Sequence, residues 1–170
     1  MKRDEETEIL AQLVLGLEPI QPLYASRQRL LAAAQGVQRF APFTRDFAKF
    51  FDLEIPNARA LLEGLHDEAG WRPGKAPGTP KFRGFTAGPG ADGLRASFAR
   101  LLPGSQIARH RHLTRELIYV LNGAMTDSDG RTYGPGEVLQ SEPGSVHSVS
   151  IGGSHECWVA SLVGDVEIAP

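Results

Sequence analysis

The chain has little cysteine, little net charge and no long apolar run, and each shortage excludes a class of protein. Its 170 residues include one cysteine, Cys157, so no disulfide can form within the chain. With 18 basic and 20 acidic residues, the net charge of −2 offers no basic excess for nucleic acid or anionic lipid. The apolar stretch from Ile9 to Leu17 is too short for a transmembrane helix and is interrupted by Gln12. We therefore expect no membrane span and no direct nucleic-acid partner.

Several familiar catalytic patterns are also missing. The opening residues, MKRDEETE, are charged and lack the apolar core of a secretory signal. The sequence contains no Ser-His-Asp order, no nucleotide-binding glycine loop and no Cys-x-x-Cys pair. We expect a cytoplasmic protein that is neither a serine hydrolase, nor a nucleotide-binding enzyme, nor a thiol oxidoreductase.

Residues 1–71 show helical periodicity. Apolar residues recur there at intervals of three and four, which places them on one face of each helix. The helical stretches are Ile9 to Leu17, Leu23 to Ala34, the stripe Phe43, Phe47, Phe50 and Phe51 after Pro42, and the stripe Ala58, Leu61, Leu62 and Leu65 after Pro56. Such stripes could form a cofactor or membrane face, but a packed core is the more common use. Helices this short are marginal alone, so we expect them to dock on another part of the chain.

Beyond the helices, residues 72–80 (RPGKAPGTP) form a connection rich in proline and glycine. Residues 81–170 then read as short strands separated by glycine-containing turns. The expected strands are Lys81–Thr86, Leu94–Leu102, Gln106–His112, Glu116–Asn122, Arg131–Tyr133, Val138–Gln140, Val146–Ile151 and Cys157–Val163. Strands at this spacing are typical of a sandwich or barrel, so the fold class is mainly β.

Three histidines and one glutamate carry the chemistry of the strand-rich part. His110 and His112 are two residues apart, so on a strand both point to the same face, while the arginines that flank them point the other way. Glu116 follows after a polar turn, and His147 follows a Pro-Gly turn later in the chain. Three neutral imidazoles and a carboxylate form a metal site with mixed nitrogen and oxygen donors. The alternative is a set of unrelated surface histidines.

The segment GSQIARHRHLTRELIYVLNG resembles the first motif of the cupin family. That motif reads Gly, five residues, His-x-His, three residues, Glu, six residues and Gly. Every fixed position is filled here, by Gly104, His110, His112, Glu116 and Gly123.

A second segment, GEVLQSEPGSVHSVSI, is similar to the second cupin motif. The motif runs Gly, five residues, Pro-x-Gly, two residues, His, three residues and Asn. Gly136, Gly144 and His147 match, whereas Glu142 stands where Pro is usual and Ile151 where Asn is usual. Neither departure removes a metal ligand.

The cupin resemblance implies a double-stranded β-helix barrel over 81–170, preceded by a small α-helical N-terminal region. It also implies that His110, His112, Glu116 and His147 hold one divalent transition metal, namely Zn, Fe, Ni, Mn or Cu. Four such ligands leave coordination positions for water, substrate or dioxygen. Cupins commonly pair, so the resemblance implies a homodimer as well.

A more specific resemblance is to cupins related to ChrR, an anti-sigma factor with a zinc-binding helical N-terminal domain. It rests on HRHLTRELIYVLNGAMTDSDGRTYGPGEVLQSEPGSVHS and on RFAPFTRDFAKFFDLEIPNARALLEGLHDEAGW, and covers most of the chain from about residue 35. The zinc domain of that anti-sigma factor uses a His-x3-Cys-x2-Cys core. Residues 1–75 contain one histidine, His66, and no cysteine, which argues against sigma-factor binding through a zinc fold. His66 is better explained as a residue at a helix end.

Other candidate residues have plainer explanations. Cys157 lies in an apolar strand, so we expect a buried structural thiol, with a redox thiol lining the cavity as the alternative. His155 follows two glycines and a serine and is expected to be exposed in a turn. Strand alternation directs Tyr119 away from the cavity and directs Ile118 and Val120 into it.

Three functions fit these features. The first is a metal-dependent enzyme, with a dioxygenase that acts on a small organic substrate as the leading form. The second is a ChrR-like sensor or regulator that contacts a protein partner through its N-terminal helices. The third is a small-molecule binding module without turnover. Fold alone does not decide among them.

Overall fold

The computed structural model describes residues 36–74, 79–91 and 93–169. The helices expected over 9–17 and 23–34 lie outside the described residues, as do residues 75–78 of the expected connection. Gly36–Pro170 form one compact unit, to which all the helices and strands named below belong.

The described part begins with short helices. A 3₁₀ helix, Val37–Phe43, leads into α3 (Thr44–Phe50), and α4 (Ile55–Glu63) follows with Pro56 in its first turn. Three further 3₁₀ turns cover Gly64–His66, Glu68–Gly70 and Pro89–Ala91. The phenylalanine stripe expected on one helix is thus divided, because Pro42 lies inside the 3₁₀ helix and α3 begins only at Thr44. Phe47 and Phe51 are fully buried, whereas Phe43 and Phe50 are half-buried.

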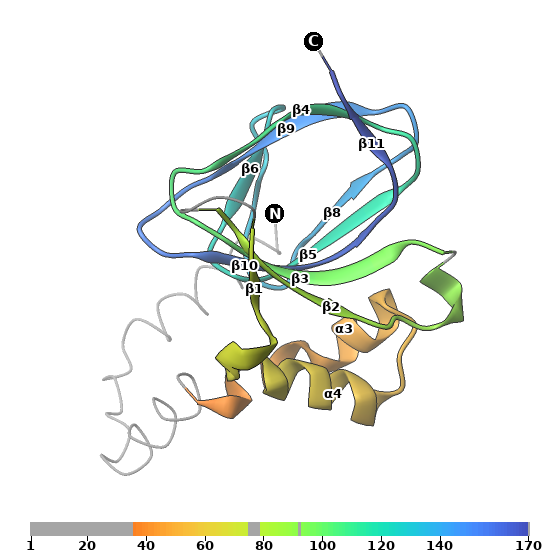
Figure 1. Ribbon diagram of the computed structural model, residues 1–170, viewed down its shortest axis with the longest axis vertical. Helices are drawn as coiled ribbons and strands as arrows, with labels where there is room; N and C mark the ends of the chain where they lie inside the picture. Colours follow the sequence, from red (N-terminus) through yellow and green to blue (C-terminus); the bar gives the residue numbers. More distant parts are fainter. Residues whose placement is uncertain (1–35, 75–78, 92, 170) are drawn as a thin grey trace, which may run out of the picture. The chain divides into compact units, whose positions relative to one another are not determined.

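The strands form two antiparallel sheets, which lie above the helices in Figure 1. The six-stranded sheet has the order β1-β2-β3-β10-β5-β8 and the five-stranded sheet the order β11-β4-β9-β6-β7. The bounds of the first are Arg72–Pro73 (β1), Lys81–Phe85 (β2), Arg95–Leu101 (β3), Cys157–Val163 (β10), Glu116–Asn122 (β5) and Val138–Ser141 (β8). Those of the second are Val166–Ile168 (β11), Gln106–His112 (β4), Val146–Ile151 (β9), Met125–Asp127 (β6) and Thr132–Tyr133 (β7). Over the described residues the sheets are not joined into one closed ring of hydrogen bonds.

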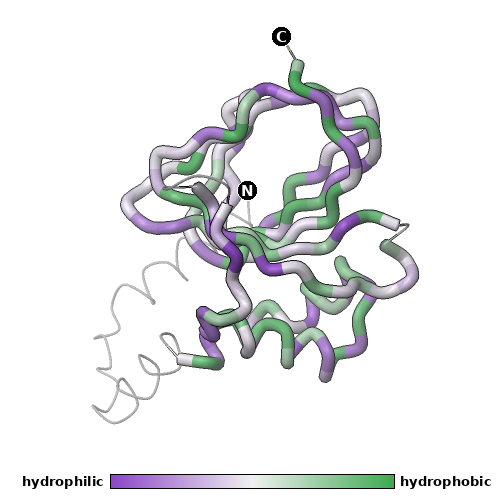
Figure 2. The backbone as a smooth tube through the Cα atoms, in the orientation of Figure 1, coloured by the Kyte–Doolittle hydropathy of each residue, from purple (hydrophilic) through white to green (hydrophobic). Residues whose placement is uncertain are grey.

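Two hydrophobic cores lie on opposite faces of the six-stranded sheet. The outer core joins that sheet to the helices and is rich in aromatic rings: Phe47 stacks on Phe98 with ring centroids 5.5 Å apart. The inner core lies on the other face and consists mostly of aliphatic side chains, among them Ile118 and Val120. Figure 2 shows apolar residues recurring along these strands, as expected for a sheet covered on both faces.

Most of the strand expectations agree with the structure. The predicted bounds of β4, β5, β9 and β10 are those observed. Three short strands were not expected: β1, β6 and β11. β1 falls inside the segment read as a connection, because Arg72 and Pro73 pair with Phe82 and Lys81 of β2.

Both glycines of the first cupin motif adopt a left-handed backbone. Gly104 and Gly123 each have φ of 74°, a conformation that residues with a side chain rarely adopt. At Gly123 a Cβ atom would also lie 2.8 Å from the Cα of Cys157. This glycine therefore allows the chain leaving β5 to pass close to β10.

Within the described residues, none of the helices has the length and apolarity needed to cross a lipid bilayer.

Candidate metal centre

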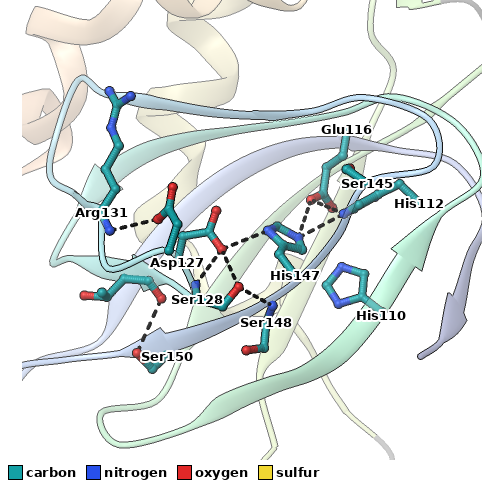
Figure 3. Close-up of polar contacts among 12 residues, drawn as sticks. His110, His112, Glu116, Asp127, Ser128, Arg131, Ser145, His147, Ser148 and Ser150 are labelled. Carbon is teal, nitrogen blue, oxygen red and sulfur yellow. Dashed lines mark hydrogen bonds and ion pairs between the residues drawn. The ribbon is translucent and has the colours of Figure 1, made fainter. Parts of the chain in front are cut away.

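Neighbouring strands bring the three predicted histidines together. His110 of β4 is paired directly with His147 of β9, so their side chains lie on the same face of the sheet. His112, two residues further along β4, shares that face. Glu116 is the first residue of β5, which belongs to the other sheet and begins just after the turn that follows β4. Its carboxylate points toward the histidines (Figure 3). The structure thus gathers all four predicted site residues.

The polar atoms of this cluster lie at distances suited to a shared ion. The ring nitrogens Nε2 of His112 and His147 are 2.9 Å apart. Oε2 of Glu116 lies 3.7 Å from Nε2 of His112 and 3.9 Å from Nε2 of His147. One ligand atom from each of the four residues falls within 4.8 Å of the others. Because metal–nitrogen bonds are about 2.0–2.1 Å long, opposite ligands of one ion are about 4.2 Å apart. The cluster is close to that size, so the four residues could hold a metal ion.

Burial and missing partners also fit a metal. His112 is 1% exposed and Glu116 8% exposed, and a buried carboxylate without a partner is costly. Within the described residues, Oε2 of Glu116 is buried and has no hydrogen-bond partner. A cation among these donors would satisfy that oxygen.

Two of the imidazoles are oriented by groups behind them. Nδ1 of His110 lies 2.8 Å from the carbonyl oxygen of Ala108, and Nδ1 of His147 lies 3.2 Å from Oδ1 of Asp127. Asp127 is itself fixed, because the same oxygen accepts a hydrogen bond from the backbone N–H of Ser128. Metal-binding histidines commonly donate the N–H of one ring nitrogen to a carbonyl or carboxylate in this way. The arrangement leaves Nε2 of both rings available for the ion.

Without a metal, the environment disfavours charge at the centre. Burial raises the pKa of Glu116 to about 7. Burial, and then the nearby His110 and His147, lower the pKa of His112 to about 4. His112 is therefore neutral at neutral pH, the form in which imidazole binds metals. A bound cation would favour the ionised carboxylate.

Asp127 is the site-region residue that sequence reasoning did not identify. It ends β6, a three-residue strand for which no periodicity could be recognised. The pairing of Asp127 with Val149 on β9 brings its carboxylate to His147. No motif in the sequence signals that contact.

The remaining candidate residues lie where the sequence suggested. Cys157 is fully buried in the inner core, and burial raises the pKa of its thiol to about 11, so it stays protonated and unreactive at neutral pH. His155 is exposed between β9 and β10. Tyr119 points away from the inner core, as expected, and its ring packs edge-on against Phe43 with centroids 6.0 Å apart. Ile118 and Val120 lie on the inner side, as expected, and both are buried in the inner core; their lining of a cavity stays a prediction.

Two facing antiparallel sheets with a His₃Glu cluster between them define a cupin fold with a potential metal site. Comparison with protein families makes the assignment more specific. The family described as the ChrR cupin-like domain matches residues 65–166, which is more than half of the chain. The chain belongs to that family.

Two solved structures with TM-scores above 0.5 support the fold. The chain is similar to a chain in the crystal structure of Rhodobacter sphaeroides SigE in complex with the anti-sigma ChrR. The TM-score is 0.52 at 18% sequence identity, and the match covers 92% of this chain and 75% of that chain. An acetylacetone dioxygenase from Acinetobacter johnsonii gives a TM-score of 0.51 at 13% identity, over 61% of this chain and 74% of that one. A cupin-like protein of unknown function from Ralstonia eutropha gives 0.41 at 23% identity, and the match covers 44% of this chain and about half, 53%, of that chain. Comparison with curated proteins finds no match.

Proposed function

We propose that the chain binds one divalent transition metal through His110, His112, Glu116 and His147, and that it is a metal-dependent dioxygenase for a small organic substrate. The observation that carries the proposal is the convergence of imidazole Nε2 atoms on the unpartnered Oε2 of Glu116. Imidazole donors suit Zn, Fe, Ni, Mn and Cu, and dioxygen chemistry narrows the choice to a redox-active ion. Such an ion, bound by four protein groups, would have positions left to hold an organic oxygen donor and dioxygen together.

The protein's own groups would shape that reaction. His110 and His147 are held by Ala108 and Asp127, so little reorganisation is needed when an ion binds. The inner core on the same face as Glu116 is aliphatic around Ile118 and Val120. Apolar walls exclude bulk water and favour an organic ligand over a polyphosphate.

A ChrR-like regulator is the second candidate. Membership of the ChrR cupin-like family and the fold similarity to the SigE–ChrR complex favour it. A protein partner would then contact the N-terminal helices, and the cupin would act as a sensor, with a homodimer as the expected assembly. The sole cysteine of the chain is buried in the inner core, so a thiolate zinc site of the anti-sigma type has no ligands near the helices. Partner binding would have to use packing surfaces instead.

One experiment separates these functions. The purified chain is loaded with iron(II), and dioxygen uptake is measured with a panel of small diketones, thiols and phenols. The enzyme proposal predicts uptake that requires both metal and one class of substrate, that is lost in His112→Ala and that persists in His155→Ala. Absence of uptake together with stable binding of a sigma factor to the full chain would favour the regulator. Ligand binding without uptake would favour the binding module.

A further inference from the structure

The last strand places two apolar side chains beside the proposed metal ligands. β11 runs antiparallel to β4, next to it in Figure 1, and pairs Val166 with His112 and Ile168 with His110. Residues directly opposite each other in an antiparallel pair project to the same face of the sheet. Val166 and Ile168 therefore project to the face that carries the histidine cluster.

An ion pair on the other face supports this orientation. Glu167 lies between the two apolar residues and pairs with Arg111 in the register. Nε of Arg111 lies 3.4 Å from Oε1 of Glu167, and both side chains are about half exposed. Because neighbouring strand residues alternate, the outer position of Glu167 means that Val166 and Ile168 lie on the inner side.

The side chains of both apolar residues are exposed to solvent, although the histidines paired with them are buried. Val166 is 45% exposed and Ile168 76% exposed, whereas His110 is 6% and His112 1% exposed. A scattered exposed apolar residue is ordinary, but here two adjoin the four-residue cluster on its own face. The two apolar side chains are therefore exposed to solvent beside the buried histidines.

Pairing with another strand explains this edge poorly. β11 has only three residues, and its central residue is the charged Glu167. Short edge strands with charged side chains are a known protection against edge-to-edge association. An apolar surface that continues from a potential metal site is better matched by the body of a small ligand bound at that site.

We propose that Val166 and Ile168 form an apolar wall of the ligand site, which takes an organic molecule with an oxygen-donor end and an apolar body. The donor end reaches the ion beside His110, and the apolar body lies along β11. This inference rests on the proposed function, because it assumes a metal at the four-residue cluster. It adds the class of ligand and the two residues that select it.

Two hydroxamates that share one metal-binding end test the inference. Acetohydroxamate has a single methyl group, whereas octanohydroxamate carries a long alkyl chain. Zinc-loaded protein is titrated with each by calorimetry. Each methylene buried against an apolar wall contributes about 0.8 kcal/mol, so the octanoyl compound is expected to bind the wild type at least about tenfold more tightly. In Val166→Ser/Ile168→Ser we expect this preference to fall to about threefold or less, with zinc content and acetohydroxamate affinity retained.

Matched variants complete the test. Glu167→Gln changes the outer face of the same strand, and Val37→Ser changes an apolar residue that is 46% exposed on the first 3₁₀ helix. Both should keep the wild-type preference. An equal preference in the β11 double variant and the wild type would overturn the inference while leaving the metal site intact. A wild-type dimer that the double variant converts to monomers would also overturn it, since β11 would then contact a second copy. Failure of the wild type to take up zinc would refute the proposed metal site itself.

Discussion

The two faces of β5 differ in the kind of side chain that they bury. Leu117, Tyr119 and Leu121 face the helices and join the aromatic outer core. Glu116 and Ile118, which alternate with them, face the inner side. Both sides are buried, so the strand reads as almost continuously apolar.

The two faces differ in how their polar atoms are satisfied. On the outer side the packing is mainly between aromatic rings. Among the described residues, Oη of Tyr119 is buried on this side of β5 without a hydrogen-bond partner. It belongs to a neutral phenol, and burial raises the pKa of that phenol to about 12. On the inner side a carboxyl oxygen and Nδ1 of His112 are buried without partners among the described residues. A neutral hydroxyl is far less costly to bury than a carboxylate. The outer face thus buries mainly aromatic packing, whereas the inner face carries the buried polar atoms of the potential metal site.

The largest expected effect comes from disrupting the outer core. Phe47→Ala removes a fully buried ring that contacts Phe51, Phe85 and Phe98. Large-to-small changes of this kind cost about 3–5 kcal/mol of unfolding free energy. Urea denaturation would measure the loss, with the exposed Val37→Ala as control, for which we expect a change within about 0.5 kcal/mol. A loss below about 1 kcal/mol would show that the helices contribute little to stability.

A somewhat smaller effect is expected from the inner carboxyl when no metal is bound. Burial raises the pKa of Glu116 from 4.5 to about 7 in the folded state. The carboxyl therefore does not lower the free energy of unfolding below about pH 4.5, where it is protonated in both states. It lowers that free energy progressively as the pH rises from about 4.5 through about 7. The full shift corresponds to about 3 kcal/mol. His112, whose pKa is lowered from 6.5 to about 4, makes the fold more stable as the pH rises from about 4 to 6.5. The pH dependence of the wild type alone would therefore mix the contributions of the two groups.

Comparison with Glu116→Gln isolates the carboxyl. In chelator-treated protein, the stability of this variant relative to the wild type should increase as the pH is raised from about 4.5 to above 7. Chemical denaturation across that range measures the difference. A constant difference would mean that the carboxyl is not destabilised by burial.

The smallest of the three effects concerns the group behind His147. Asp127→Asn keeps the shape of the side chain but removes the charge that lies 3.2 Å from Nδ1. Loss of such an orienting partner typically weakens metal affinity by about 10–100-fold. Competition titration with a chromogenic zinc chelator would measure it. Asp129→Asn, in the same turn, changes a side chain that accepts from the backbone N–H of Arg131 and should leave zinc affinity unchanged. Equal affinities for the two variants would show that Asp127 does not orient His147.

The sequence predicted those parts of the fold that depend on local patterns. β4, β5, β9 and β10 were bounded correctly, because each is long enough to show a pattern and is flanked by turn residues. The four clustered residues were identified because the first motif places three of them within one segment and the second motif supplies His147.

What could not be predicted depends on contacts between distant segments. β6 and β11 have three residues each, which is too few to show a periodicity. They are strands because they pair with β9 and β4, which are distant from them in the sequence. Asp127 and Ile168 owe their positions to those pairings, so neither stands out in the sequence. The division of the phenylalanine stripe likewise reflects a backbone change around Pro42.

Metal content tests the central claim most directly. Wild type, His112→Ala and His155→Ala are purified in parallel, shown to be folded by circular dichroism, and exposed to equal amounts of zinc before desalting and elemental analysis. We predict one ion per chain in the wild type and in His155→Ala, whose histidine is exposed in a turn, and a clear loss in His112→Ala. Equal, near-zero metal in wild type and His112→Ala would contradict the claim.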